Sequence, residues 1–413
     1  MKVAVVGTGI AGLGAAYLLM RRHDVEVFEQ ARTLGGHSNT ISVIGPGGRP
    51  LGLDTGFLVH NHTNYPNLVR LFAELGVATQ DSEMSFSVSC ERCRLEYSGR
   101  GPWAQGTNLL RPGFLSLSRE IVRFLRTADQ EVSRLDGDIT LSEFTTNAGY
   151  STNFRDHFLM PLTASIWSTA PDQALEFPAA FAIGFLRNHG MLGLRRFTWR
   201  TVTGGSRTYV DAITTRLGSR VHAETRVTTV RRDPDGVDVI VADGTSRRFD
   251  AVVLATHADQ SLALLADPSA DEARVLGAFT FTENETVLHS DPRMIPRRRG
   301  ARAAWNYRIA DCRSQTSALT MTYDLNRLQA LPRERPYLVT LNRGAEIAEH
   351  EIITRIVYHH PRVTFASLRA QDELPQIAGQ RRTWFCGAWQ GYGFHEDGFV
   401  SAIRVARDFG VEW

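Results

Sequence analysis

The sequence predicts an α/β fold with a parallel β-sheet at its centre and a second domain built from inserted segments. KVAVV at residues 2–6 is a short β-branched run, and DVEVFEQ at residues 24–30 is another. Such runs are typical of strands buried in a parallel sheet. A helical stretch separates them. A chain of 413 residues is also too long to fold around one ordinary hydrophobic core. The pattern therefore predicts a strand, a helix and a second strand within a chain of two domains.

The turn after the first strand carries the spacing Gly7-x-Gly9-x-x-Gly12. In this pattern the first glycine permits a tight turn, the second lets a pyrophosphate approach, and the third lets the helix pack on the strand. The N–H groups and the dipole of the helix start bind the phosphates. Glu29 ends the next strand, where a carboxylate accepts the ribose hydroxyls. The sequence thus predicts a Rossmann-like dinucleotide site, and the acid disfavours NADP.

Composition and charge limit the kinds of function that this protein can have. Hydrophobic residues make up 43% of the chain and charged residues 22%, as in soluble globular proteins. A net charge of +2 argues against a dedicated nucleic-acid-binding protein. Lys2 is the only lysine, so no other lysine can act as a Schiff base or general base.

The N-terminal apolar run is not interpreted as a signal peptide, because it has a strict glycine pattern and lacks a small-residue cleavage site. No apolar run reaches the roughly 20 residues that span a bilayer. We therefore expect a cytoplasmic protein without a transmembrane segment.

The four cysteines are Cys90, Cys93, Cys312 and Cys386. They are too few for a disulfide framework in a chain of this size. Cys90 and Cys93 form a C-x-x-C, but no second pair exists to complete a zinc site. We interpret the pair as the tip of a hairpin and expect no metal, with metal or redox use as the alternative.

The residues after Glu29 read QARTLGGHSNT and include Arg32, Gly35, Gly36 and Thr40. This stretch resembles the FAD-binding signature of the amine oxidase, phytoene desaturase and protoporphyrinogen oxidase superfamily. The resemblance implies that the glycine doublet lets the backbone pass close to the FAD pyrophosphate and that the arginine helps to hold the nucleotide. It implies FAD as the cofactor and a Rossmann-like domain of the amine oxidase, or glutathione reductase-like, type with an interleaved α+β substrate domain.

Three further stretches carry the resemblance. LDTGFLVHN at residues 53–61 is similar to the family's Asp-x-Gly strand leading to the isoalloxazine, which implies contacts from Thr55, Gly56 and Phe57. VTGGSRTYVDAITTRLG looks like the family's return to the cofactor domain. RVTTVRRDPDGVDVIVADG then has the pattern of two strands joined by a turn at residues 233–236. In the family a valine of the first strand contacts adenine, and here Val227 fits that role.

The last candidate stretch is TWFCGAWQGYGFHEDGFVSAIRVARDFG. A strand ends at Gly387, a loop follows, and apolar residues at helical spacing predict a closing helix. The superfamily points the start of this helix at the flavin N1–C2 edge, where a helix N-terminus favours the negative charge of the reduced ring. The resemblance implies that Phe394 contacts the cofactor there.

Three adjacent polar residues, His395, Glu396 and Asp397, precede that helix. A metal site is excluded by their spacing, because adjacent residues do not readily converge on one ion. Asp397 is a natural N-cap and Glu396 a natural first-turn acid. We expect capping and flavin contact together, with His395 best able to reach the ring or the substrate.

The sequence departs from the family in two respects. Ala388 stands where an acid often touches the ribityl or phosphate region, and Glu396 or Asp397 is a candidate substitute. The lysine that several amine oxidases place near flavin N5 has no counterpart, which argues against amine oxidation.

We expect residues 1–84, 202–264 and 382–413 to form the FAD-binding domain and residues 85–201 and 265–381 the substrate domain. Residues 114–135 have apolar residues at helical spacing with arginines between them, which predicts an amphipathic helix. We interpret it as a surface helix, with peripheral membrane contact as the alternative. The apolar stretch 154–192 fits either a core or an apolar tunnel beside the flavin.

Nearly the full chain resembles one branch of the superfamily, and the stretches that carry this resemblance are DTGFLVHNHTNYPNL, MSFSVS, FRDHFLMPLTASIWST, HADQSLALLADPS, AAWNYR and GYGFHEDGFVSA. The branch consists of bacterial FAD-dependent oxidoreductases often encoded beside cyclopropane-fatty-acid-synthase-like methyltransferases. This resemblance implies a desaturase or oxidase acting on a small or lipid-like substrate, with an amine oxidase or a redox-neutral isomerase as alternatives. His395, Tyr392 and His60 are the candidate catalytic residues. The sequence carries no signal for an oligomeric state.

Overall fold

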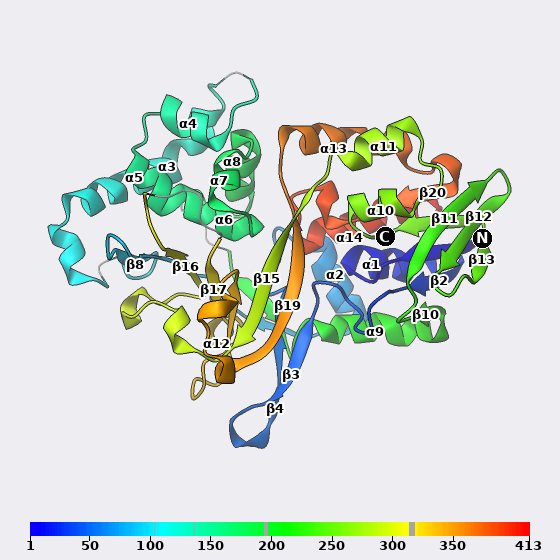
Figure 1. Cartoon of the computed structure of the whole chain (residues 1–413), viewed down its shortest axis with the longest axis horizontal. Helices are drawn as coiled ribbons and strands as arrows, with labels where there is room; N and C mark the ends of the chain where they lie inside the picture. The colour runs from blue at the N-terminus through cyan, green and yellow to red at the C-terminus, as the bar shows by residue number, and fades with distance from the viewer. Residues whose placement is uncertain (103, 136, 194–196, 314–318) are drawn as a thin grey trace.

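The first strand of the chain lies in the middle of a five-stranded parallel sheet. In the computed structural model, which describes residues 1–413 except 103, 136, 194–196 and 314–318, the chain has an α/β fold (Figure 1). The strand order is β10 (Val221–His222), β2 (Asp24–Phe28), β1 (Lys2–Val6), β14 (Ala251–Leu254) and β20 (Thr383–Phe385). Every neighbouring pair is parallel. The predicted order of strand, helix and strand is confirmed.

Side chains of β1 alternate between two hydrophobic cores, as the period of a strand requires. Val3 and Val5 face the core that contains α1 (Ile10–Leu19) and α14 (His395–Asp408). A Cβ added to Gly14 of α1 would lie 2.6 Å from the ring of Phe399 in α14. The first and last helices therefore pack directly on each other, and both chain ends lie in the same part of the molecule (Figure 1).

The other face of the sheet is covered by the rest of the nucleotide-binding segments. Ala4 and Val6 face a core shared with a three-stranded antiparallel sheet and three helices. The turn between the first two of these strands occupies residues 233–236 as predicted, and the Asp233 carboxylate accepts the N–H groups of Asp235 and Gly236. The elements are β11 (Val227–Asp233), β12 (Gly236–Val241), β13 (Ser246–Phe249), α10 (Ala258–Leu264), α11 (Ala270–Gly277) and α13 (Phe365–Ile377).

A seven-stranded sheet forms the second half of the molecule. All of its neighbouring pairs are antiparallel except β16 and β7, which are parallel. It draws strands from two segments far apart in the sequence, as expected of an inserted α+β unit. In spatial order the strands are β19 (Ile352–Pro361), β15 (Phe281–His289), β18 (Leu338–Leu341), β17 (Met321–Asp324), β16 (Trp305–Ile309), β7 (Phe86–Cys90) and β8 (Glu96–Ser98).

A layer of helices covers one side of this sheet (Figure 1). The helix predicted at residues 114–135 is α3 (Pro112–Val132), and much of the apolar stretch 154–192 packs in one buried aromatic and aliphatic core. Much of this stretch therefore forms core, which is one of the two alternatives that the sequence allowed for it. Other helices of this half are α4 (Leu141–Asn147), α5 (Thr152–Phe154), a π-helix (Arg155–Leu159), α6 (Met160–Trp167), α7 (Pro171–Leu175), α8 (Ala179–Asn188) and α12 (Leu325–Leu328).

Smaller elements connect the two halves. The hairpin of β3 (Thr40–Ile44) and β4 (Pro50–Asp54) projects from the molecule (Figure 1). A three-stranded sheet joins β5, β9 and β6, and two helices lie beside the parallel sheet. Within the described ranges, no helix combines the length and apolar character needed to cross a bilayer. The bounds are β5 (His60–Asn61), β6 (Thr79–Asp81), β9 (Trp199–Val202), α2 (Pro66–Leu75) and α9 (Arg207–Leu217).

Candidate cofactor and substrate site

The glycine turn after β1 has the close packing that its spacing requires. Gly7 has φ +102°, and a Cβ there would lie 2.8 Å from the Ala255 carbonyl oxygen. A Cβ on Gly12 would lie 2.0 Å from the Gly7 carbonyl oxygen. No side chain fits either position without a backbone shift, because real Cβ contacts do not come this close. The turn and α1 are therefore locked together by glycine.

Gly9 differs from its two neighbours in the motif because it faces open space. A Cβ on Gly9 would meet no atom within 4 Å, while a Cβ on Gly36 would lie 3.2 Å from the Gly9 Cα. The predicted glycine doublet, Gly35-Gly36, thus lies beside this turn, and the space next to Gly9 stays open. The N–H groups of a helix start, with space in front of them, suit an anion such as a pyrophosphate.

Glu29 lies at the end of β2 beside this turn. Its Oε2 accepts the Thr8 N–H at 3.0 Å and the Thr8 hydroxyl at 2.6 Å, and its Oε1 accepts the Ala31 N–H at 2.9 Å. The residue is partly exposed, so the carboxylate is oriented and still reachable. The Thr225 N–H donates to the Glu29 carbonyl at 2.7 Å, which brings the start of β11 and Val227 to the same end. Arg32 is exposed just beyond.

Thr40 is part of a buried polar network. Its hydroxyl donates to Asp54 Oδ1 at 2.5 Å and accepts the Arg207 N–H at 2.9 Å. Asp54 also accepts the N–H and the hydroxyl of Ser206. Burial raises the pKa of Asp54 to about 6, and the bonds from Thr40 and Ser206 oppose the rise. Thr40 therefore ties the hairpin of β3 and β4 to the start of α9, and its role toward FAD stays a prediction.

Thr55 and Gly56 follow this network, and Thr55 contacts β19, a strand of the other sheet. The Thr55 hydroxyl lies 2.7 Å from the Tyr358 hydroxyl, and a Cβ on Gly56 would lie 2.3 Å from the His37 carbonyl oxygen. The Asn39 amide donates to Tyr358 Oη at 3.1 Å. The predicted FAD-binding stretches therefore pack against one another and against the second sheet.

The start of α14 differs from the sequence expectation. Asp397 was expected to be the N-cap, but the helix begins at His395, and Asp397 accepts the Phe394 N–H at 2.9 Å from inside the first turn. Glu396 accepts the N–H groups of Asn67 and Leu68 at 3.0 and 2.9 Å, so it caps α2 as well as standing in its own first turn. The start of α2 is near in space and distant in sequence, which explains why the spacing alone did not indicate it.

His395 joins the last helix to the segment after the glycine doublet. Its Nε2 lies 2.8 Å from the Ser38 hydroxyl, and its ring stacks on Phe57 with centroids 3.8 Å apart. Ser38 also makes a short contact with the Tyr209 hydroxyl. Loss of solvent around the ring, with smaller contributions from His37 and His60, holds the pKa of His395 well below its usual range. The imidazole is therefore neutral near pH 7.

His60 lies behind Phe57 in an aromatic environment. The ring is 1% exposed and packs edge-on against Phe72 at 5.3 Å. Among the described residues neither ring nitrogen has a hydrogen-bond partner, and burial lowers the pKa of His60 to about 4. His60 is thus a neutral, buried ring that does not line the cavity described next, although it packs edge-on against Tyr65 of that lining at 6.4 Å.

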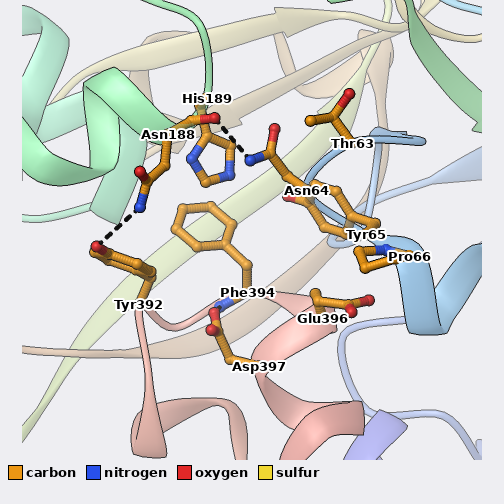
Figure 2. Close-up of a pocket in the computed structure, with 10 residues that line it drawn as sticks. All are labelled: Thr63, Asn64, Tyr65, Pro66, Asn188, His189, Tyr392, Phe394, Glu396 and Asp397. Atoms are coloured by element: carbon orange, nitrogen blue, oxygen red, sulfur yellow. Dashed lines mark hydrogen bonds between the residues drawn. The ribbon is translucent and has the colours of Figure 1, made fainter.

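A cavity of about 370 Å³ lies in front of the start of α14. Figure 2 shows the Phe394 ring pointing toward His189, with Tyr392 to one side and Tyr65 to the other. Asn188 Nδ2 donates to Tyr392 Oη at 3.3 Å, and Asn64 Nδ2 donates to the Asn188 carbonyl at 2.7 Å. The lining residues are Thr63, Asn64, Tyr65, Pro66, Asn188, His189, Tyr392, Phe394, Glu396 and Asp397. Of the three predicted catalytic residues, Tyr392 lies in this lining.

Aromatic rings from the inserted helices form the wall behind this cavity. Phe185 of α8 stacks on His189 at 3.8 Å and on Phe394 at 4.9 Å. The Trp167 indole N–H donates to the Tyr392 carbonyl at 2.9 Å. Burial raises the pKa of Tyr392 and lowers that of His189 to about 4. Both groups are therefore uncharged near pH 7, and the wall is apolar.

The carboxylates of Glu396 and Asp397 are the acidic groups of the cavity. Burial raises the pKa of both, that of Asp397 to about 6. Backbone N–H groups already satisfy part of each carboxylate. With a pKa of about 6, Asp397 is mostly ionised near pH 7. Because both carboxylates accept backbone N–H groups, their first role is to anchor the starts of α2 and α14.

The sequence did not indicate a group of aromatic and imidazole rings beside Thr55. His37 stacks on Tyr358 at 4.6 Å, and His360 Nδ1 lies 3.0 Å from the Asn284 amide. Burial lowers the pKa of His37 to about 4 and that of His360 to about 3. The doublet His359-His360 was visible in the sequence, but only the pairing of β19 with β15 shows that its second member faces the glycine-rich segment.

A model of the flavin containing amine oxidoreductase family matches residues 10–295. The chain belongs to this family. It is a flavin-dependent oxidoreductase, and its cofactor is FAD. The open space at Gly9 and the oriented Glu29 carboxylate fit such a group. A search of curated proteins finds no match to the sequence.

Several solved structures share the fold across nearly the whole chain. A CLA-producing fatty acid isomerase from P. acnes is 15% identical with a TM-score of 0.68, and 98% of each chain is covered. A putrescine oxidase bound to putrescine is 15% identical with a TM-score of 0.70 and 99% coverage of each chain. The cyclohexylamine oxidase of Brevibacterium oxydans IH-35A is 16% identical with a TM-score of 0.66 and 99% coverage of each chain. At these identities the likeness establishes the fold and leaves the substrate open.

Proposed function

We propose that this member of the family oxidises or desaturates an apolar, lipid-like substrate by removing a hydride from an activated C–H bond. The cavity at the start of α14 carries the proposal, because uncharged rings, those of His189, Tyr392 and Phe394 among them, line it beside several polar side chains. Phe185 of α8 packs behind two of these rings. Apolar ligands bind in concave sites lined by such rings with a few polar groups for orientation. When bound, FAD supplies the two-electron acceptor at flavin N5.

The residues of the chain would orient the substrate and move a proton. A protonated Tyr392 hydroxyl at the cavity edge can donate a hydrogen bond to the substrate. His395 has a neutral imidazole and is the first candidate to accept a proton, with His60 as the buried alternative. Asp397 adds a carboxylate whose raised pKa would let it hold a proton in mildly acidic solution.

Amine oxidation is the second candidate. Two carboxylates at the cavity, Glu396 and Asp397, are the observation that favours it, since they could face an ammonium group. Backbone N–H groups already bond to both, and the only lysine pairs with Glu26 at the opposite end of β1. These contacts weaken the case for a family mechanism that uses a lysine near the flavin.

A redox-neutral isomerase is the third candidate, supported by the fold shared with a fatty acid isomerase. The resemblance to members encoded beside cyclopropane-fatty-acid-synthase-like methyltransferases supports a methylated fatty acyl chain as the substrate class. A cytoplasmic location remains part of this proposal.

Peripheral membrane contact is also proposed for α3 and the turn before it. Leu110 is 84% exposed, Leu109 54% and Val122 47%, and the exposed Arg119 and Arg126 lie on the same helix. Exposed leucines beside arginines favour anionic lipid surfaces. Sedimentation with vesicles containing anionic lipid should carry the protein down, and Leu110→Ser should reduce the bound fraction. Equal sedimentation of both proteins would contradict the contact.

Anaerobic mixing of the FAD-loaded enzyme with candidate substrates tests the function. Acyl lipids should bleach the flavin absorbance, and a panel of amines should not. Bleaching by amines with peroxide release in air would favour amine oxidation instead. A product of unchanged mass without net electron transfer would identify an isomerase. Mass spectrometry of material released from the denatured protein would name the bound class directly.

A further inference from the structure

A cluster of three cysteines and one histidine lies in the inserted half of the molecule, apart from the cavity. The Sγ atoms of Cys90, Cys93 and Cys312 and a ring nitrogen of His157 all lie within 4.8 Å of one another. The sequence interpretation of the C-x-x-C as a hairpin tip is confirmed, because β7 pairs antiparallel with β8 and Cys93 lies in the turn between them. The residues that complete the cluster come from segments about 65 and 220 positions further on.

We propose that Cys90, Cys93, His157 and Cys312 bind a structural Zn²⁺ ion. Three thiolates and one imidazole are one of the ligand sets of closed, tetrahedral zinc sites. Soft sulfur ligands select zinc over magnesium or calcium, which prefer oxygen. A C-x-x-C in a hairpin turn also supplies two of the four ligands at the usual spacing.

The distances agree with a tetrahedral ion. Zn–S bonds of about 2.3 Å and a Zn–N bond of about 2.0–2.1 Å would put a sulfur and a nitrogen ligand about 3.5 Å apart and two sulfurs about 3.8 Å apart. The Cys93 Sγ lies 3.5 Å from the His157 Nε2. No two of the four ligand atoms are more than 4.8 Å apart, so a shift of at most about 1 Å brings each pair to a tetrahedral edge.

His157 is held in the orientation that a zinc ligand needs. Its Nδ1 lies 3.3 Å from the Asn153 carbonyl oxygen, so Nδ1 carries the proton and Nε2 faces the cysteines with its lone pair. Zinc-binding histidines usually direct their second nitrogen to a carbonyl or carboxylate in this way. His157 also lies in a π-helix, a rare geometry found mostly at functional sites.

The surroundings suit the charge of the loaded site. Three thiolates, a neutral imidazole and Zn²⁺ sum to one negative charge, and binding releases the three thiol protons to solvent. The Arg111 guanidinium donates to the Cys93 carbonyl at 3.3 Å and so places a positive charge at the backbone of one of the four ligands. The Tyr97 hydroxyl donates to the His157 carbonyl at 2.6 Å and fixes the π-helix to β8.

An ion at this place would join three elements of the inserted half. It would hold the β7–β8 hairpin tip, the π-helix and the loop after β16 at one point. Those elements belong to the sheet edge and to the helical layer above it, so the ion would stabilise the contact between the two layers. This role is independent of the proposed reaction.

Metal analysis of the purified, FAD-loaded enzyme tests the proposal. Protein made with zinc in the medium should hold about one zinc per chain, and Cys93→Ser and Cys312→Ser should hold less than about a tenth of that. Cys386→Ala is the matched control, because Cys386 lies in the other half, and its zinc content should equal that of the wild type. Zinc absent from the wild type, or retained in full by both serine variants, would overturn the proposal.

A second measurement needs no variant, so it holds even if the variants fold poorly. Cys93 is exposed and should react quickly with an alkylating reagent when it is a free thiol. In the native wild type Cys93 should resist alkylation, and a strong chelator should speed its reaction at least about tenfold. The buried Cys386 should stay unreactive in both conditions. Rapid alkylation before chelation, or a disulfide between two of the three cysteines without zinc, would refute the site.

Discussion

The Nε2 atom of His395 lies 2.8 Å from the Oγ atom of Ser38, which joins the first turn of the last helix to the segment after the glycine doublet. The two residues are 357 positions apart in the sequence. Because the pKa of His395 lies well below its usual range, this contact is a hydrogen bond between neutral groups near pH 7. The contact makes His395 the first residue to test by substitution.

Replacing His395 with alanine should slow flavin reduction by the substrate at least about tenfold while FAD stays bound, since a general base typically contributes about 10²–10⁴-fold. Anaerobic stopped-flow absorbance measures the rate, and the flavin spectrum reports the bound cofactor. His350→Ala, at an exposed histidine outside the site, is the control. An unchanged reduction rate would remove His395 from the mechanism.

Two glycines of the same motif should respond differently to alanine. Gly9 has φ −61° and open space beside its Cα, so Gly9→Ala should leave the apoprotein stability within about 0.5 kcal/mol. Its methyl group would occupy the space expected for the pyrophosphate, and FAD affinity should fall at least about tenfold.

Gly12→Ala should instead destabilise the apoprotein, because its Cβ would lie 2.0 Å from a backbone oxygen. Overpacking of this kind typically costs about 1–3 kcal/mol. Chemical denaturation of both apoproteins and flavin titration of the folded fraction separate the two effects. Equal stability losses would show that the space at Gly9 is not free.

Glu29→Gln should weaken FAD binding while the fold is kept. A hydrogen bond to a charged acceptor contributes about 1.5–3 kcal/mol, which corresponds to roughly 10- to 150-fold in affinity. Glu26→Gln is the matched control on the same strand, where the carboxylate pairs with Lys2 and Arg247. Titration by flavin fluorescence measures both. Equal affinities of Glu29→Gln and the wild type would exclude Glu29 from the nucleotide site.

The apoprotein should lose stability as the pH rises through the pKa of Asp54. Burial raises this pKa from 3.8 to about 6, so the folded state binds a proton more tightly than the unfolded chain. The resulting stabilisation is complete below about pH 4 and disappears above about pH 6, a change of about 3 kcal/mol for this group.

Urea unfolding at a series of pH values between 4 and 8 measures the effect, and Asp54→Asn should show a smaller change over this window. The asparagine cannot titrate, although it also changes the bonds with Thr40 and Ser206. A wild type whose unfolding free energy rises from pH 5 to pH 8 by the same amount as that of the variant would contradict the assignment.

Local patterns predicted the parts of the fold that depend on neighbours in sequence. Strand β1, the turn at Gly7, strand β2 just before Glu29 and the turn at residues 233–236 all follow from short-range residue preferences. Contacts between distant segments were not accessible in this way. Glu396 was expected to serve its own helix, but it also caps α2 some 330 residues earlier. Likewise, His157 and Cys312 reach the C-x-x-C only through tertiary packing.

The packing of α14 on α1 has a consequence for how the chain matures. Strand β1 is made first, but one of its flanking layers is complete only when residues 395–408 have left the ribosome. Until then the face of α1 that packs on α14 has no cover, and the nascent chain exposes a surface that chaperones recognise. Ribosome-bound chains stopped before residue 383 should therefore be protease-sensitive around residues 10–19, and released full-length chains should not.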